Sequence, residues 1–235
     1  MRARAAGVGY KPQECIAMKK TRFLYLIQIE SKIDLETAIM APTFDNPGDI
    51  VTSPYKFAHV VLRTNKYEQK VKFYQVFFGA EVRFSNEILS LLGYDDEHHR
   101  IGIINLEIAN KNPMTCGLEH LSFTYESLDD LVLAALQREK HGMKPTWCTN
   151  HGPTTSIYYK DPDGNNLETQ VDNFETMKEA DEFLASEAFK VNPVGVDFTV
   201  EELLDRLRSG EDHASIKTRP PSGPRDFDDV PEEAR

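Results

Sequence analysis

The chain has 235 residues, with 27 Lys and Arg against 38 Asp and Glu, and so carries a formal net charge of −11. This charge disfavours nucleic acid and anionic membrane surfaces as partners, and an uncharged or small substrate fits better. Hydrophobic residues make up 40% and charged residues 28%, which is ordinary for a soluble globular protein. The three cysteines, Cys15, Cys116 and Cys148, are too few for a disulfide framework or a four-thiolate zinc site, so a reducing, cytoplasmic compartment is expected.

Residues 1–53 lack sustained hydrophobic periodicity and are expected to form an extended or disordered N-terminal arm. The segment 1–24 is rich in Lys and Arg and contains a single acidic residue, Glu14, as in a mitochondrial transit peptide. The alternative is an unstructured extension, or translation that starts at Met18 or Met40. No apolar run approaches the roughly 20 residues that span a bilayer, so no membrane segment is expected.

A first structural unit, residues 54–110, is predicted to have the element order βαβββ. The run Lys56–Arg63 is rich in β-branched and aromatic residues, which predicts a strand. Asn65 is expected to cap a helix that ends at Gly79, because apolar residues recur at helical spacing between them. Three short strands are then predicted at Ala80–Phe84, Ile88–Leu92 and Arg100–Glu107.

The same order starts again over residues 117–172, and this internal repeat is the main architectural signal. Leu118–Thr124 predicts a strand, and Ser127 is expected to cap a helix that ends at Gly142. Three more strands are predicted at Met143–Trp147, Ser156–Tyr159 and Asn166–Val171. The two repeats together define a predicted domain over residues 54–172.

The remaining residues, 173–235, are predicted to be C-terminal helices and a disordered tail. Phe174–Phe189 and Thr199–Arg208 have the pattern of surface helices. Residues 209–235 are rich in proline and acidic side chains, so we expect them to be disordered or to lie over a neighbouring subunit.

The segment Asp161–Gly164 predicts a tight turn between the last two strands, because its proline presets φ and its glycine supplies a positive φ. Glu168 then lies on the final strand. Superposition of the two repeats places His59 and His120 at equivalent positions in their opening strands. Two imidazoles and one carboxylate on related inward positions form a facial triad with open coordination sites, which suits non-haem Fe(II).

These residues and the motif DPDGNNLE resemble the vicinal-oxygen-chelate superfamily, which includes glyoxalase I, fosfomycin-resistance proteins and type I extradiol ring-cleaving dioxygenases. The resemblance covers about residues 54–172, and the motif is common to the superfamily. It implies an α+β fold in which two βαβββ repeats form a cup-shaped mixed sheet around a metal site. The ligands that match are His59, His120 and Glu168.

Finer matches favour the extradiol branch. The run His98-His99-Arg100-Ile101-Gly102-Ile103 is similar to the extradiol run His-His-x-Ile-Ala-Leu, whose second histidine is an acid/base residue, and His99 matches that histidine. Extradiol pockets also contain a His and a Tyr, the Tyr ten residues before the ligand Glu; here these are His151 and Tyr158, about two residues nearer to each other than in the family. The resemblance implies that His99 moves protons and that His151 and Tyr158 hydrogen-bond the substrate oxygens.

The implied activity is an Fe(II)-dependent dioxygenase that cleaves a catechol-type aromatic ring next to its vicinal diol, using O2, in aromatic compound catabolism. Mn(II) is an alternative metal. Family members usually associate, so a homo-oligomer is expected. The large extradiol enzymes carry an additional metal-free half, for which this chain is too short.

Three other activities of the same fold remain open. A glyoxalase-type lyase or isomerase would use Zn(II) or Ni(II) and a fourth ligand from the last strand of the first repeat, for which Glu107 is the candidate. A fosfomycin-type thiol transferase has similar ligand spacing, but no basic cluster for a phosphonate is found near the predicted site. A metal-free binding module, as in bleomycin resistance, would not need all three ligand types.

Overall fold

The computed structural model describes residues 44–45, 49–112 and 115–235. Contacts divide the chain into the units Met1–Lys56 and Phe57–Arg235, and all helices and strands of the described residues belong to the second unit. The expected N-terminal arm, with its possible transit peptide and alternative start sites, falls almost wholly outside the described residues. Within the described ranges, no helix has the length and apolar character needed to cross a membrane.

The two predicted βαβββ repeats are confirmed. The first contains β1 (Val60–Thr64), α2 (Tyr67–Phe78), β2 (Glu81–Ser85), β3 (Leu89–Gly93) and β4 (Ile101–Asn105). The second contains β5 (His120–Thr124), α3 (Leu128–Glu139), β6 (Trp147–Asn150), β7 (Thr154–Lys160) and β8 (Asn166–Asp172). The C-terminal part adds α4 (Met177–Leu184), α5 (Glu187–Val191), β9 (Val196–Asp197), α6 (Val200–Arg208), α7 (His213–Lys217) and the 3-10 turns η1 (Phe227–Asp229) and η2 (Glu232–Ala234).

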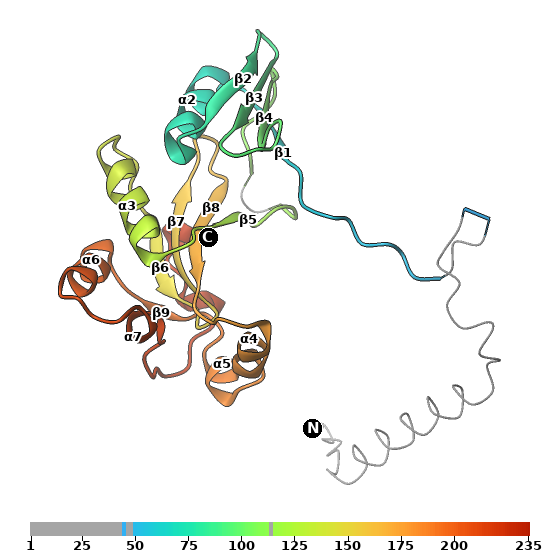
Figure 1. Ribbon diagram of the computed structural model, residues 1–235. Helices are drawn as coiled ribbons and strands as arrows, with labels where there is room; N and C mark the ends of the chain where they lie inside the picture. Colours follow the sequence, from blue (N-terminus) through green and yellow to red (C-terminus); the bar gives the residue numbers. More distant parts are fainter. Residues whose placement is uncertain (1–43, 46–48, 113–114) are drawn as a thin grey trace, which may run out of the picture. The chain divides into compact units, whose positions relative to one another are not determined.

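The strands form two mixed sheets, one for each repeat, which confirms the α+β class (Figure 1). The first has the order β1-β4-β3-β2 and the second the order β5-β8-β7-β6-β9. In both, the opening strand pairs in parallel with the last strand of its own repeat, and the other pairings are antiparallel. β1 and β5, the strands expected to present the histidine ligands, are therefore edge strands.

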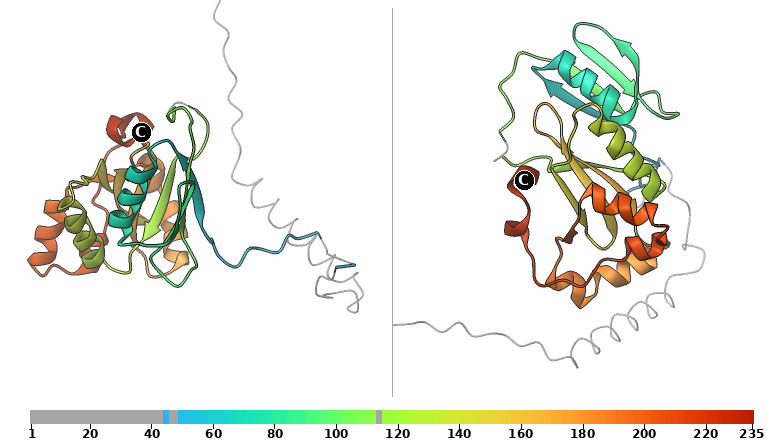
Figure 2. Two further views of the ribbon diagram at one scale, coloured as in Figure 1. Left: turned by 90° about the horizontal axis from the view of Figure 1, so that it is seen from above. Right: turned by 90° about the vertical axis from the view of Figure 1, so that its left-hand side faces the viewer.

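Successive residues of a strand point to opposite sides of a sheet. In β7 and β8 one side faces the hydrophobic core, and the other, called here the free face, points away from that core. Ile157, Tyr159 and Leu167 are 0%, 1% and 0% exposed and belong to the hydrophobic core. On the core side, α3 contacts β8 and also packs against α6 (Figure 2). The intervening residues Tyr158 and Glu168 consequently point to the other face of the sheet.

Two buried polar contacts tie the repeats together through α2. The Lys70 ammonium, 0% exposed, lies 2.6 Å from Asp163 and 3.0 Å from Asp161 in the turn before β8. In the second contact, the Arg138 guanidinium of α3 donates to the carbonyl oxygen of Phe77, in α2, at 3.0 and 2.8 Å. The helix of the first repeat thus fixes the turn that leads to the last strand of the second.

The predicted start of the first helix is wrong. The N-cap of α2 is Lys66 rather than Asn65, because the Thr64 hydroxyl accepts from the Lys66 backbone N–H at 2.9 Å. The Asn65 amide instead donates to the Ile108 carbonyl oxygen at 2.8 Å. The other predicted cap is confirmed, since Ser127 accepts from the backbone of the first turn of α3.

Two further elements differ from expectation. The strand predicted at Met143–Trp147 begins only at Trp147, because β6 is set by its long-range pairing with β7 and β9. The helix predicted over Phe174–Phe189 is divided into α4 and α5. The reason is local: Ser186 acts as a new N-cap, its hydroxyl accepting from the Phe189 backbone N–H.

Residues 209–235, expected to be disordered or to lie on a neighbouring subunit, contain α7, η1 and η2 and bind their own domain. Arg219 donates to the Asn192 carbonyl oxygen at 2.8 Å. Arg225 makes a bidentate contact with the Asp197 carboxylate at 2.8 and 3.1 Å. These long-range arginine contacts hold a segment whose composition alone suggests disorder.

Candidate active site

The free face of the second sheet carries a row of side chains across four strands. In the strand register Ser122 of β5 lies opposite Glu168 of β8, Glu168 opposite Tyr158 of β7, and Tyr158 opposite Trp147 of β6. Directly opposed residues share a face of the sheet. The register therefore places a carboxylate, a phenol and an indole side by side.

Glu168 is the centre of this row and is only 4% exposed. The Tyr158 hydroxyl donates to its Oε1 at 2.9 Å, and His120 Nε2 lies 3.2 Å from its Oε2. Burial raises the pKa of this carboxyl, but hydrogen bonds from His120, Ser156, Ser122 and Tyr158 outweigh that effect and lower the pKa to about 2. Glu168 is thus a buried anion at neutral pH.

His120, the first residue of β5, is the partner of this anion. Its hydrogen bond to Glu168 raises its pKa to about 9 against the opposing effect of burial, and Glu119 contributes to the rise. A metal ion binds neutral imidazole, so a divalent cation held by these two side chains would replace the proton between them. One predicted imidazole ligand and the predicted carboxylate ligand are therefore in contact.

His151 and Tyr158 also meet, despite the shorter spacing between them in this sequence. His151 Nε2 lies 2.9 Å from the Tyr158 hydroxyl and 4.0 Å from Glu168 Oε1. Its Nδ1 contacts the Val194 carbonyl oxygen, which fixes the ring. Burial, reinforced by the charge of Glu168, raises the pKa of Tyr158, so the phenol remains protonated.

His59, the third predicted ligand, lies just before β1 in a different group. Its ring centroid is 4.3 Å from that of His99 and 5.9 Å from that of His98. Among the residues that the structure describes, these three histidines are the one group of three or more His, Cys, Asp or Glu residues whose ligand atoms all lie within 4.8 Å of one another. Burial, followed by the charges of His59 and His98, lowers the pKa of His99.

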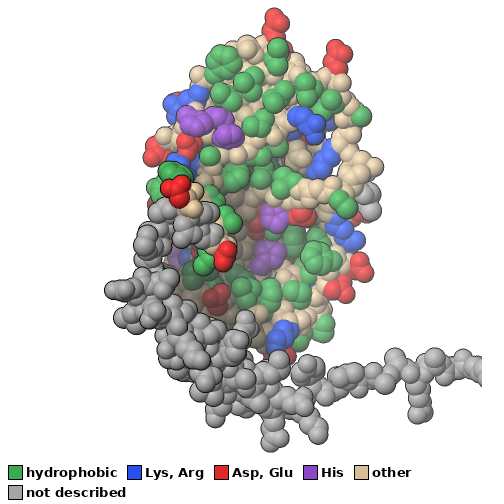
Figure 3. All heavy atoms as spheres, turned by 90° about the vertical axis from the view of Figure 1, so that its right-hand side faces the viewer, with side chains coloured by type: hydrophobic (Ala, Val, Ile, Leu, Met, Phe, Trp, Pro, Cys, Tyr) green, Lys and Arg blue, Asp and Glu red, His purple; other side chains and the backbone are tan. Residues whose placement is uncertain are grey.

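The structure thus brings the predicted site residues together in two groups. Histidine side chains gather at two places on the face shown in Figure 3, with hydrophobic side chains between them. A cavity of about 480 Å³ lies between the two edge strands and is lined by Val60 of β1 and Leu121 of β5 among others. The predicted triad is therefore shared between the two repeats, with His120 and Glu168 in contact and His59 beside His98 and His99.

The donor atoms fit a divalent transition metal. Imidazole nitrogens and a buried, ionised carboxylate are suitable for Fe(II), Mn(II), Zn(II) and Ni(II). Glu107, the candidate fourth ligand of a glyoxalase-type site, is exposed and lies beyond the end of β4. The donor chemistry supports a metal but does not select one.

Sequence reasoning missed Trp147 as part of the site. Its ring centroid is 5.0 Å from that of Tyr158 with an interplanar angle of 26°, and 5.4 Å from that of His151 at 85°. The sequence predicted a strand ending at Trp147, whereas the strand begins there. Only the observed register with β7 shows that the indole lies beside Tyr158.

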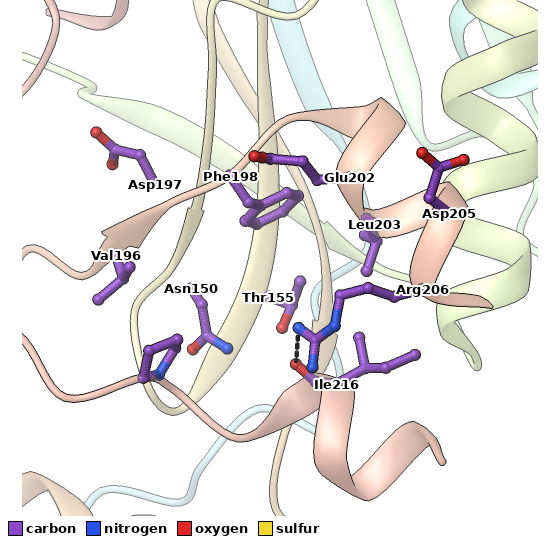
Figure 4. A pocket seen from close by; sticks show the side chains of 11 residues that line it. Asn150, Thr155, Val196, Asp197, Phe198, Glu202, Leu203, Asp205, Arg206 and Ile216 are labelled. Carbon is purple, nitrogen blue, oxygen red and sulfur yellow. Dashed lines mark hydrogen bonds between the residues drawn. The ribbon is translucent and has the colours of Figure 1, made fainter. Parts of the chain in front are cut away.

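A second cavity, of about 450 Å³, lies between the edge of the second sheet and helices α6 and α7 (Figure 4). Two of its polar side chains have partners: Arg206 binds Glu211 at 2.8 and 2.5 Å, and the Asn150 amide donates to the Lys217 carbonyl oxygen. None of the predicted site residues lines it. The cavity between the two edge strands is not lined by them either, so the contacts of Glu168, and not a cavity, define the candidate active site.

Comparisons with known proteins give consistent results. Residues 56–169 match the family model described as the Glyoxalase/Bleomycin resistance protein/Dioxygenase superfamily. Two curated relatives from Rhodococcus globerulus are biphenyl-2,3-diol 1,2-dioxygenase 3, 34% identical over 167 residues, and biphenyl-2,3-diol 1,2-dioxygenase 2, 37% identical over 162 residues. The alignments cover 70% and 68% of this chain and 88% and 85% of the relatives, so both relatives are themselves shorter than this chain.

Solved structures resemble part of the chain. A lactoylglutathione lyase from Agrobacterium tumefaciens is 16% identical and covers 51% of this chain and 96% of its own, with a TM-score of 0.42. The fosfomycin resistance protein FosX from Listeria monocytogenes is 20% identical and covers 54% of this chain and 98% of its own, with a TM-score of 0.41.

Proposed function

Because this chain belongs to the glyoxalase/bleomycin resistance protein/dioxygenase superfamily and is an extradiol dioxygenase-like oxidoreductase, we propose that it cleaves an aromatic vicinal diol with O2. In the relatives' names the 1,2 bond adjoins the 2,3-diol, which supports cleavage next to the two hydroxyls. The observation that carries the proposal is the buried Glu168 carboxylate, in contact with the His120 imidazole and the Tyr158 phenol.

We propose Fe(II) as the metal, with His59, His120 and Glu168 as its ligands and Mn(II) as the alternative. When bound, the metal would supply a centre at which the diol oxygens and dioxygen meet. The side chains around Glu168 have separate roles. The Tyr158 hydroxyl and His151 Nε2, 2.9 Å apart, are placed to hydrogen-bond a substrate hydroxyl beside the carboxylate. Tyr158 keeps its proton and donates a hydrogen bond to Glu168 at 2.9 Å, so its oxygen accepts a hydrogen bond from the substrate hydroxyl and does not act as a base.

His99 is the proposed acid/base residue. It is 9% exposed and packs against His59, so it lies beside a proposed ligand without contact to Glu168 in the described structure. An imidazole in this place accepts the proton of a diol hydroxyl and returns it to the ring-opened product. The role requires a nitrogen that is not bound to the metal.

The test of this function is turnover by anaerobically loaded protein. With Fe(II) and 2,3-dihydroxybiphenyl, we expect dioxygen consumption and a yellow ring-cleavage product. His59→Ala, His120→Ala and Glu168→Ala should each lose iron and activity together. Stoichiometric iron with full turnover in any of the three would remove that residue from the proposed ligand set. Tight Zn(II) or Ni(II) binding without dioxygen consumption would favour a glyoxalase-type lyase instead.

The histidine group offers a rival ligand set, His59, His98 and His99, that the same protein can test. His59→Ala loses iron under both assignments and so cannot distinguish them. His98→Ala decides, because His98 belongs only to the rival set. We expect that variant to keep the iron content of the parent, and loss of iron from it would favour the three-histidine set.

Assembly and compartment complete the proposal. We propose a homo-oligomer, in line with the usual association of family members, and a cytoplasmic location. Light scattering on the metal-loaded protein tests the first, and a monomer over the working concentration range would refute it. Fractionation of the source cells tests the second.

A further inference from the structure

Trp147 is the single tryptophan of the chain, and it stands at the end of the row that contains Glu168 and Tyr158. Its indole stacks beside the Tyr158 ring and meets the His151 ring edge to face. It is only partly buried. A flat aromatic surface therefore lies next to the two residues proposed to hold the diol.

The orientation of this indole is fixed by a charged pair. Trp147 Nε1 donates to Asp197 Oδ1 at 2.9 Å, and the Arg225 guanidinium holds both oxygens of that carboxylate at 2.8 and 3.1 Å. A bidentate Arg–carboxylate contact sets geometry as well as charge. The indole ring is thus held by a residue that lies 78 positions further along the chain (225 − 147).

The backbone that carries Asp197 approaches β6 closely. Gly195 has a φ of +121°, and a Cβ at this position would lie 2.6 Å from both the Asn150 carbonyl oxygen and the Thr149 hydroxyl. A glycine is therefore required for β9 to reach the edge of the sheet. The result is a strand of two residues whose Asp197 lies opposite Thr149 and within reach of Trp147.

From Arg225 the chain continues to the same face of the second sheet. The Asn166 amide donates to the Ala234 carbonyl oxygen at 3.1 Å, and the Lys160 ammonium donates to the backbone oxygen of Arg235 at 2.9 Å. In the register Asn166 lies opposite His120. The segment 225–235 is therefore bonded at both ends to residues that border the site, and Figure 1 shows the C-terminal end beside β5 and β8.

We propose that Trp147 is a substrate-contacting residue whose indole packs against an aromatic substituent of the diol. Asp197 and Arg225 position the indole, and the segment 225–235 forms the adjoining wall of the site. This inference rests on the proposed function and adds a substrate-contacting residue to it. Because Trp147 lies beyond Tyr158 in the row, the indole would contact a second ring on the diol and would contribute to the binding of a two-ring diol but not of catechol. A favourable aromatic contact corresponds to about two- to tenfold in affinity.

Fluorescence tests the contact without turnover. Since Trp147 is the only tryptophan, its emission reports on this corner of the site alone. Under anaerobic conditions, titration of the Fe(II)-loaded protein with 2,3-dihydroxybiphenyl should quench or shift the emission in a saturable way. N-acetyltryptophanamide corrects for absorbance by the diol. Competition with catechol shows at which diol concentrations binding is saturated. An unchanged emission at those concentrations would overturn the inference.

Kinetics on two substrates test the preference. Trp147→Leu should lower kcat/KM for 2,3-dihydroxybiphenyl about tenfold, mainly through KM, with little change for catechol. Trp147→Phe should restore most of the loss, because it retains an aromatic face. A general structural defect would lower kcat/KM equally for both substrates. An equal loss, or no loss, would refute the role of Trp147.

Arg225→Ala tests the positioning residues. In this variant we expect KM for the two-ring diol to rise less than in Trp147→Leu. We also expect acrylamide to quench the fluorescence of Trp147 more strongly than in the parent. Arg208→Ala, which removes an exposed cation of α6, is the matched control and should change neither. Unchanged acrylamide quenching in Arg225→Ala would show that Arg225 does not position the indole. If the parent turns over neither diol, the proposed function fails, and the anaerobic titration still decides the contact.

Discussion

Removal of the buried Lys70 ammonium is the most direct test of how the two repeats are joined. Lys70 is 0% exposed and contacts two carboxylates, of which Asp161 is also 0% exposed. Loss of one member of a buried ion pair costs about 3–5 kcal/mol, because the remaining charge stays buried without its partner. Lys70→Met keeps the length of the side chain and removes only the charge and the hydrogen bonds.

The structure places the expected cost at the lower end of that range. Asp161 keeps hydrogen bonds from the Tyr74 hydroxyl and from the turn backbone at Asp163 and Asn165, each at 2.9 Å. Asp163 is partly exposed and remains partly hydrated. We therefore expect Lys70→Met to lower the free energy of unfolding by about 3 kcal/mol, a large part of the roughly 5–15 kcal/mol of a typical domain.

Urea denaturation followed by circular dichroism measures this change. Lys66→Met is the matched control. The Lys66 side chain is 39% exposed, and its ammonium lies 3.7 Å from Asp163 and donates to the Pro162 carbonyl oxygen, so its loss should cost less than about 1 kcal/mol. Asp163→Asn in the Lys70→Met background should recover part of the loss, because it removes one unpaired charge. A change below about 1 kcal/mol for Lys70→Met would show that the buried contact does not join the repeats.

Other outcomes are expected at the site and at the domain boundary. His99→Asn should keep the iron content of the parent while turnover falls about 10²- to 10⁴-fold, and lost iron would make His99 a ligand. Burial raises the pKa of Asp163, but hydrogen bonds from Lys70 and Thr64 outweigh burial, and the pKa is lowered overall. The ionised Asp163 side chain therefore contributes its full stabilisation above the ordinary carboxyl pKa and loses it as the pH falls through the lowered value. Urea titrations should accordingly show the advantage of the parent over Asp163→Asn shrinking in acid, and a constant difference would contradict this. Limited proteolysis should cut before residue 54 and spare residues 54–172, and early cleavage inside that range would refute the domain assignment.

Local signals account for the parts of the fold and site that the sequence predicted. The turn before β8 follows from its own chemistry, since Gly164 has a φ of +79° and Asp161 accepts from the backbone of the turn. Once that turn is known, alternation along β7 and β8 places Tyr158 and Glu168 on one face. The contact between Glu168 and His120 then follows from the parallel pairing of the opening and closing strands of the repeat.

Long-range contacts account for what the sequence did not predict. The start of β6 depends on its register with β7 and β9, which no local pattern encodes. The C-terminal segment has the composition of a disordered tail, yet Arg219 and Arg225 attach it to the domain. The role of Trp147 depends on both features, because its neighbours are Tyr158 of β7 and Asp197 of β9, and Asp197 is in turn bound by Arg225 of this segment.

The turn Asp161–Gly164 is a sequence motif and also connects the two repeats of the domain. Its two carboxylates bind Lys70 of the first repeat, and β8, with Glu168 as its third residue, follows directly. The position of Glu168 relative to the first repeat is therefore set through a short, buried path. His59 belongs to that first repeat, so the spacing between the two groups of proposed ligands depends on the same path.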